Sequence, residues 1–325
     1  MEQQFIRKTL DLLKEQREWE KRYKGYLKDI MHHPGKWEKP FRKPEGLSLY
    51  TTLGTRNERT YFLRFKGQNV GKISIKKKRG IILNSMVSES KSHEINECPL
   101  KSVQPVDWKS NEASTFRHYF KHLPDTTKTK SPEHHVENSL LKEFRKKNGA
   151  EKRIRNIQPV LLHGQFFQMP TPLKASDHKP TYSGEKGGGI DILARFRTID
   201  GHIRLCVCEV KDQNKDKESQ KDAMSQAVTY ATFIAKLLTV QPEWWEVFAG
   251  HKKQRDAISK QWDKECIEVV TIMPTGTSEI FDNMELAVPG TKFKLACRSL
   301  YYDEQEFENF ANFKFSGTFL EDIKK

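Results

Sequence analysis

Two carboxylates and one ammonium group are spaced in this sequence so that they could act together on a metal ion. Glu209 and Lys211 end the apolar run Leu-Cys-Val-Cys-Glu-Val-Lys, which is typical of a buried strand. Alternate residues of a strand share a face, so the two side chains project to the same side. Asp191 begins the preceding strand pattern, and a hairpin would bring it beside them. Oxygen ligands of this kind suit Mg²⁺ or Mn²⁺, and a nearby lysine can help activate water or offset charge on phosphate.

The segments around these residues predict the framework that positions them. Residues 190–197 and 202–211 read as two strands joined by a tight turn at 198–201. A helix over 220–238 follows, with an apolar stripe at helical spacing. Further elements are expected as a helix over 133–147, a strand over 160–169, a loop over 174–189, a helix near 244–248, and strands over 267–273 and 292–301.

The same residues, in this order, resemble the PD-(D/E)XK nuclease superfamily over about residues 133–275. The resemblance is carried by Gly188-Gly189-Ile190-Asp191, by Cys208-Glu209-Val210-Lys211, and by a following helix with Gln226 and Tyr230. Ile190 stands where the name-giving motif has proline. The family resemblance implies an α/β domain with a restriction-endonuclease-like mixed sheet flanked by helices, and a metal-dependent phosphodiester hydrolase that acts on DNA more readily than on RNA.

Roles for individual residues follow from that resemblance. Asp191 and Glu209 would be metal ligands together with the carbonyl of Val210, and Lys211 would be the catalytic lysine. Gln226 would be the supporting polar residue of the following helix. An acid on the leading helix completes the set, with Glu137 favoured over Glu133.

Plainer interpretations stand beside these assignments. Gln226 could be an ordinary amide on a helix surface, and Cys206 and Cys208 are expected to pack in the core. The glycines at 187–189 precede a strand and not a helix, so they predict close backbone access for a substrate or a flexible loop. Glu89-Ser90-Lys91 shows that Glu-x-Lys alone is weak evidence, because it ends no apolar strand.

The positive charge of the chain is concentrated in its first part. The formal net charge is +14, and residues 1–130 carry 28 Lys and Arg against 15 Asp and Glu. Such asymmetry favours a polyanionic partner such as nucleic acid. A helix is expected over 1–31 with a kink at Gly25, followed by a hairpin of strands over 61–66 and 70–82. The candidate phosphate contacts on its basic face are Arg64, Lys66, Lys72, Lys76 and Lys78, although a solvated surface would look the same.

These observations predict two domains, with a polar, proline-bounded stretch at 121–132 between them. Residues 1–125 would form a basic α+β domain that binds nucleic acid or a partner, and residues 126–325 the nuclease domain. A fragment beginning near Ser131 is therefore expected to retain the metal site. Five scattered cysteines, no signal peptide and no membrane-spanning run predict a cytoplasmic protein. A homodimer, a nuclease acting on RNA, and a non-catalytic nucleic-acid-binding protein with a nuclease fold stay open as alternatives.

Overall fold

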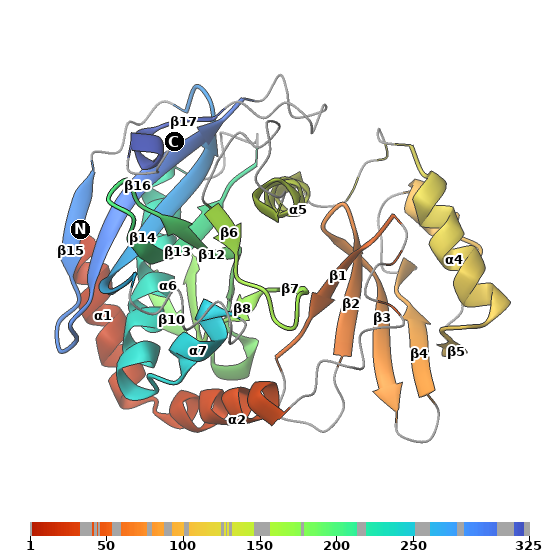
Figure 1. Ribbon diagram of the computed structural model, residues 1–325, viewed down its shortest axis with the longest axis horizontal. Helices are drawn as coiled ribbons and strands as arrows, with labels where there is room; N and C mark the ends of the chain where they lie inside the picture. Colours follow the sequence, from red (N-terminus) through yellow and green to blue (C-terminus); the bar gives the residue numbers. More distant parts are fainter. Residues whose placement is uncertain are drawn as a thin grey trace. The chain divides into compact units, whose positions relative to one another are not determined.

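The protein is a mixed α/β chain with mixed parallel and antiparallel sheets (Figure 1). The computed structural model describes residues 2–32, 41, 44, 46–53, 60–76, 80–87, 93–100, 104–124, 127, 129, 132–145, 157–176, 179–212, 219–250, 261–277, 283–303 and 315–321. The chain divides into two compact units. The first comprises Met1–Leu27, Leu140–Val160 and Gln168–Lys325, and the second comprises Lys28–Ser139 and Leu161–Phe167.

This division differs from the predicted one at residue 125. Residues 1–27 group with the C-terminal part of the chain, and the second unit extends to residue 139 and takes back residues 161–167. The second unit therefore has 21 Lys and Arg against 12 Asp and Glu, and the first has 36 against 31. Both units are basic, and the charge asymmetry is weaker than a cut at residue 130 implies.

The first unit is built on a seven-stranded mixed sheet in the order β15-β16-β14-β13-β12-β6, with β17 also paired to β16. Its strands are β6 (Ile157–Pro159), β12 (Ile192–Arg197), β13 (Ile203–Val210), β14 (Trp262–Pro274), β15 (Met284–Ala287), β16 (Lys294–Tyr302) and β17 (Phe315–Ser316). The β12–β13 pair is antiparallel, whereas β13, β14 and β16 run parallel. Strands predicted at 190–197, 202–211, 267–273 and 292–301 are thus confirmed, with shifted ends.

Helix α6 (Gln220–Val240) connects β13 to the parallel strand β14 and packs against β13, β14 and β16. It begins at a capping box in which Ser219 and Asp222 satisfy each other's backbone N–H groups. Its predicted stripe is buried at Met224, Ala227, Val228, Ala231, Ile234 and Leu238. Helix α7 (Trp244–Ala249) follows, and the short helix η5 (Thr318–Glu321) lies against β16.

Two small sheets occupy the segment before Asp191, where the sequence predicted a strand and then a loop. They consist of β8 (Met169–Pro170) with β11 (Gly189–Ile190) and of β9 (Leu173–Ser176) with β10 (Lys179–Tyr182), followed by the short helix η2 (Gly184–Lys186). The loop prediction was wrong because these strands pair with one another and need no long apolar run. The strand predicted over 160–169 was also wrong, since a turn with positive φ at His163 and Gly164 interrupts it.

The N-terminal helices supply part of the first unit's core. Helices α1 (Glu2–Glu15) and α2 (Glu18–His32) replace the single predicted helix, and the break lies at residues 16–17 and not at Gly25. Trp19 is fully buried, donates its indole N–H to the Leu13 carbonyl at 3.0 Å, and meets Phe233 of α6 edge to face at 5.6 Å between ring centroids. The indole bond back to α1 fixes the bend between the helices.

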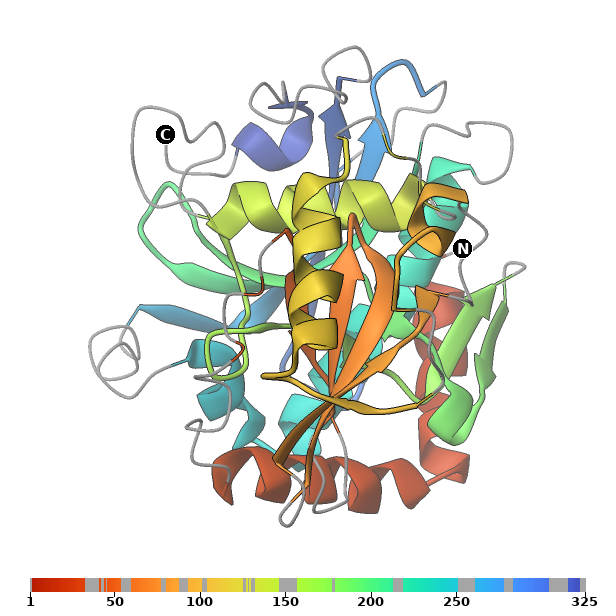
Figure 2. The same ribbon diagram turned by 90° about the vertical axis from the view of Figure 1, so that its right-hand side faces the viewer.

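The second unit has a six-stranded sheet in the order β5-β4-β3-β2-β1-β7. Its strands are β1 (Ser48–Thr51), β2 (Thr60–Phe65), β3 (Gln68–Lys76), β4 (Gly80–Ser85), β5 (Val106–Asp107) and β7 (Phe166–Phe167), and its helices include α3 (His93–Asn96), α4 (Asn111–His122) and residues of α5 (Pro132–Arg145). Helix α4 lies in front of the strands of this sheet in Figure 2 and buries Phe116 and Phe120 in a core shared with Leu63.

The predicted basic hairpin of this unit is corrected to three strands. The run over 70–82 is divided between β3 and β4, and the first turn lies at Lys66 and Gly67, which both have positive φ. Helix α5 confirms the helix predicted over 133–147.

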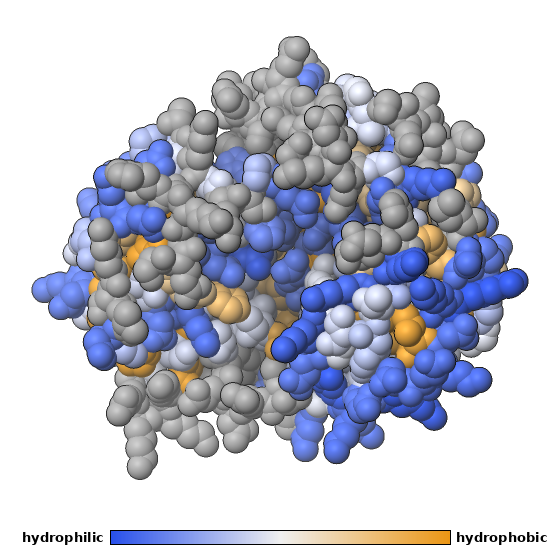
Figure 3. Space-filling model, turned by 180° about the vertical axis from the view of Figure 1, so that it is seen from behind, coloured by the Kyte–Doolittle hydropathy of each residue, from blue (hydrophilic) through white to orange (hydrophobic). Residues whose placement is uncertain are grey.

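Described surfaces are mainly polar. Hydrophilic side chains dominate the described residues on the face in Figure 3, and the exposed large hydrophobic residues among those described are Met31, Ile199 and Val240. Within the described part of the chain, no helix is long and apolar enough to span a membrane.

Candidate active site

The β12–β13 hairpin brings Asp191 to the end of β13. Ile192 pairs with Cys208 in the antiparallel register, which places Asp191, one residue earlier, opposite the last residues of β13. Its Oδ2 atom accepts a hydrogen bond of 2.9 Å from the backbone N–H of Val210. The carboxylate is thereby fixed beside Glu209 and Lys211, as the strand pattern predicted.

Glu209 and Lys211 form a buried ion pair on one face of β13. The Nζ of Lys211 donates to Oε1 of Glu209 at 2.9 Å, and the two residues are 7% and 2% exposed, respectively. Burial of either charge alone would be strongly unfavourable, so the pair is stable only because the two groups compensate each other. The sheet end therefore holds a desolvated ammonium group between polar partners.

Helix α6 contributes the next two members of the cluster. Lys211 Nζ also donates to Oε1 of Gln226 at 3.2 Å, and Gln226 Nε2 lies 3.5 Å from the hydroxyl of Tyr230. Burial, followed by the negative charge of Glu209, raises the pKa of Tyr230 to about 12. The Tyr230 hydroxyl is therefore neutral at physiological pH and can both donate and accept. Gln226 is partly exposed, and its bond to Lys211 favours the supporting role over that of an ordinary surface amide.

The backbone of Lys211 is held by two residues that the sequence did not single out, one on β14 and one on β16. Its N–H donates to the Ile272 carbonyl at 2.9 Å, and its carbonyl accepts from the buried hydroxyl of Tyr302 at 2.9 Å. Tyr302 lies on β16, about 90 residues away. No local motif marks it, and only the strand order reveals its position.

The glycines before Asp191 allow close packing within the first unit. A Cβ on Gly187 would lie 1.8 Å from the Thr171 carbonyl oxygen, and one on Gly188 would lie 2.4 Å from the Tyr230 hydroxyl. These distances show that close contacts within the chain leave no room for a Cβ at Gly187 and Gly188. The predicted roles in substrate access or loop flexibility are not needed to explain them.

Replacing Gly187 with alanine is therefore expected to destabilise the protein more than replacing Gly201. The Gly187 Cβ would overlap a backbone atom that cannot move aside, whereas a Gly201 Cβ meets nothing within 4 Å and carries only the strain of its positive φ, about 1 kcal/mol. Urea unfolding of both variants measures the difference. Equal losses of unfolding free energy would contradict the close approach at Gly187.

The predicted leading-helix acid, Glu137, groups with the second unit. It is 2% exposed, and its Oε1 lies 3.6 Å from the guanidinium of Arg64 in that unit. Glu133, the alternative, is partly exposed near the start of α5. Neither residue is placed with respect to Asp191, so a role for either in the site stays a prediction.

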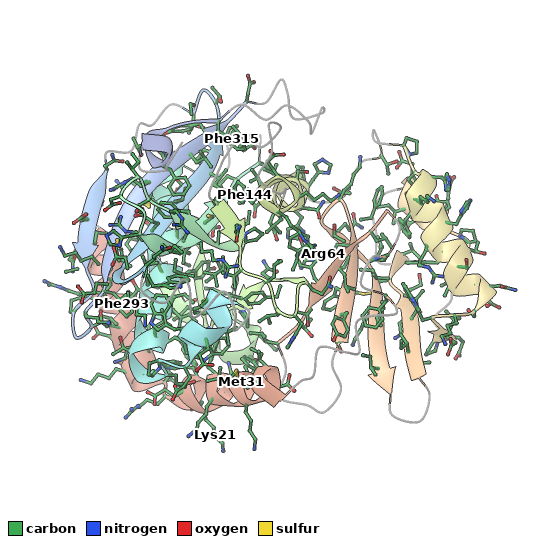
Figure 4. All side chains as sticks on the ribbon, viewed as in Figure 1. Lys21, Met31, Arg64, Phe144, Phe293 and Phe315 are labelled. Carbon is green, nitrogen blue, oxygen red and sulfur yellow. The ribbon has the colours of Figure 1, made fainter. Side chains whose placement is uncertain are left out.

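Arg64 does not lie on an exposed basic face. Its side chain is 11% exposed, its Nε donates to Asn69 Oδ1 at 3.0 Å, and its guanidinium stacks 4.0 Å from the ring centroid of Tyr50. Figure 4 labels Arg64 in the sheet of the second unit. With these partners and Glu137 around it, the guanidinium has a structural role that alternation along β2 could not predict.

The four predicted lysines fall into two groups. Lys66 and Lys72 are partly exposed, and Lys66 Nζ donates to the Thr127 carbonyl at 3.3 Å. The side chain of Lys76 and the whole of Lys78 lie outside the described residues. Phosphate binding by these lysines stays a prediction.

The donors near Lys211 suit a hard divalent cation. Among the described residues, no group of three or more His, Cys, Asp or Glu side chains could hold a metal ion. Asp191 and Glu209 supply two carboxylates, and Mg²⁺ is commonly bound by one or two carboxylates, with water and substrate phosphate completing its shell. The donor set therefore fits Mg²⁺ or Mn²⁺, and it lacks the thiols or imidazoles of a zinc site.

Comparison of the chain with protein-family models, curated proteins and solved structures gives no match.

Proposed function

We propose that the protein is a metal-dependent nuclease that hydrolyses phosphodiester bonds with a restriction-endonuclease-like site in its first unit. The observation that carries this proposal is the buried Lys211 ammonium group, bonded to both Glu209 and Gln226, with the Asp191 carboxylate fixed at the adjacent Val210 N–H. Buried charged groups gathered at one end of a sheet are unfavourable for stability, and such clusters are typical of catalytic sites.

Asp191, Glu209 and the carbonyl of Val210 would hold the cation. When bound, Mg²⁺ or Mn²⁺ stabilises the negative charge that develops on phosphate and makes water more acidic. The chain's own residues would orient the reacting groups and stabilise developing charge. Val210 N–H orients Asp191, and Gln226 and Glu209 orient the Lys211 ammonium group. The Lys211 ammonium group lies in a water-poor environment, where it would stabilise a developing anion more strongly than it could in water.

DNA is the proposed substrate in preference to RNA, because of the resemblance to nucleases that act on DNA. An RNA-directed nuclease and a non-catalytic nucleic-acid-binding protein are the alternatives. The first would use the same residues. The second is disfavoured because the acid, acid and lysine set is complete, with Lys211 bonded to Glu209 and Asp191 bonded to the intervening Val210 N–H. The full-length protein incubated with labelled DNA and RNA, with and without divalent cation, distinguishes the three.

Cleavage is expected to require Mg²⁺ or Mn²⁺, and Ca²⁺ is expected to support it poorly. Ca²⁺ binds oxygen ligands at longer distances and in looser geometry, which would misplace the attacking water. The measurement is the initial rate of cleavage in each metal at equal concentration and in excess chelator. Rapid cleavage in chelator would exclude the proposed mechanism.

A further inference from the structure

The sheet face that carries Glu209 changes from apolar to polar within one row of residues. The register of β13, β14 and β16 places residues side by side in the rows Leu205, Ile267 and Leu295, then Val207, Val269 and Cys297, then Glu209, Thr271 and Ser299. Residues paired across parallel strands point to the same face. Thr271 is therefore the direct neighbour of Glu209 on the face that this carboxylate occupies.

The hydroxyl of Thr271 is buried without a partner. The residue is fully buried, and its Oγ1 has no hydrogen-bond partner among the residues that the structure describes. The hydroxyl of Ser299, the next residue in the row, lies 3.4 Å from the Thr318 hydroxyl. Thr271 is thus the polar residue of this row whose hydroxyl is not accounted for.

A valine would fill the position of Thr271 with nearly the same shape and no polar atom. The flanking residues Val270 and Ile272 are β-branched and apolar, so the strand readily accepts such side chains. An unpaired buried hydroxyl lowers stability, and each such case calls for an explanation, of which a partner that arrives with a ligand is one. Because Thr271 lies beside Glu209, the ligand that brings this partner would be the cation of the proposed site.

We propose that Thr271 is a positioning residue of the divalent-cation site, and that its hydroxyl hydrogen-bonds a water of the hydration shell of the cation held by Asp191 and Glu209. This inference rests on the proposed function. Mg²⁺ retains several of its waters when it binds protein carboxylates. Groups that hydrogen-bond to the ligands of a metal orient them and contribute to metal affinity. Thr271 acts through that water and does not contact the scissile phosphate.

The test compares Thr271→Val with Thr271→Ser and with the matched change Thr9→Val in the full-length protein. Thr9, on α1 of the same unit, is also fully buried, and its Oγ1 has no hydrogen-bond partner in the described part of the chain. The readout is the thermal unfolding midpoint, measured first in chelator and then across a Mn²⁺ titration. It reports on cation binding without any nucleic acid.

In chelator, both valine variants should unfold at or above the midpoint of the unmodified protein, because each removes an unpaired buried hydroxyl. Thr271→Val alone should then need about 10–100-fold more Mn²⁺ for the same rise in midpoint. Thr271→Ser, which keeps a hydroxyl, should respond to Mn²⁺ at concentrations close to those of the unmodified protein.

Two results would overturn the inference alone. One is a normal Mn²⁺ response in Thr271→Val, and the other is a lower midpoint of that variant in chelator, which would reveal a structural partner for the hydroxyl. If the unmodified protein neither responds to Mn²⁺ nor cleaves nucleic acid, the proposed function fails as well. The two failures are therefore distinguishable.

Discussion

Replacing Glu209 with glutamine is expected to reduce the rate of metal-dependent cleavage by about 1000-fold or more. A metal ligand contributes several kcal/mol of transition-state stabilisation, and about 1.4 kcal/mol corresponds to a tenfold change in rate. Asp191→Asn should have a similar effect. Glu209→Gln keeps the shape of the side chain but removes the charge that pairs with Lys211 and that is proposed to bind the cation. The measurement is the initial rate of cleavage at saturating Mg²⁺.

Glu285→Gln is the matched control for this change. Glu285 also faces a lysine, Lys294 at 4.0 Å, but in that pair both side chains are largely exposed. Its loss should leave cleavage and stability nearly unchanged. Cleavage by Glu209→Gln at the normal rate would show that the site is assigned wrongly.

The Glu209 variant leaves Lys211 buried without its carboxylate partner, so its stability must be measured beside its activity. Removing one partner of a buried pair is destabilising by about 3–5 kcal/mol, whereas replacing both is often nearly neutral. A double variant, Glu209→Gln with Lys211→Met, should therefore regain stability without regaining cleavage. That combination separates loss of chemistry from loss of folding.

Trp19→Ala is expected to lower the unfolding free energy by about 3–5 kcal/mol, the range for truncating a fully buried aromatic side chain. Trp19 contacts Phe233 and bonds the Leu13 carbonyl, so its removal leaves a cavity between α1, α2 and α6. Urea unfolding of the full-length protein measures the loss. The control is Lys21→Ala, since Lys21 lies exposed on α2 and points away from the ribbon in Figure 4. This variant should change the unfolding free energy by no more than about 0.5 kcal/mol.

The same packing predicts that a fragment starting near residue 131 will not fold, contrary to the expectation from the sequence. Such a fragment lacks Trp19 and Tyr23, which bury aromatic surface against Phe233. It also lacks Glu20, whose carbonyl accepts a bond of 2.7 Å from Gln241. A well-folded fragment with a cooperative thermal transition would contradict this role of the N-terminal helices.

The sequence predicted the parts of the fold whose signals are local. The alternation that ends in Glu209 and Lys211 and the apolar stripe of α6 each lie within one continuous element, and both are present in the structure. The Asp191 position followed from them, because a tight hairpin leaves little freedom of register.

Features that depend on distant partners could not be predicted in this way. Arg64 looked like a surface cation because alternation along β2 says nothing of Tyr50 and Glu137 around it. Tyr302 comes beside Lys211, and Thr271 beside Glu209, only because of the order of the parallel strands, and no local sequence pattern encodes that order. The polar segment that forms β9 and β10 has too little apolar periodicity for its strands to be predicted from the sequence.

The placement of α1 and α2 in the first unit has a consequence for how the chain must be made. Phe233, against which Trp19 packs, follows it about 200 residues later, so these helices leave the ribosome well before their partner. At about 5–20 residues per second, the helices wait on the order of 10–40 seconds for that partner. Throughout that interval their apolar faces are exposed, and the second unit can fold before the first is complete. That interval is thus a stage at which the apolar faces of α1 and α2 are open to aggregation unless chaperones cover them.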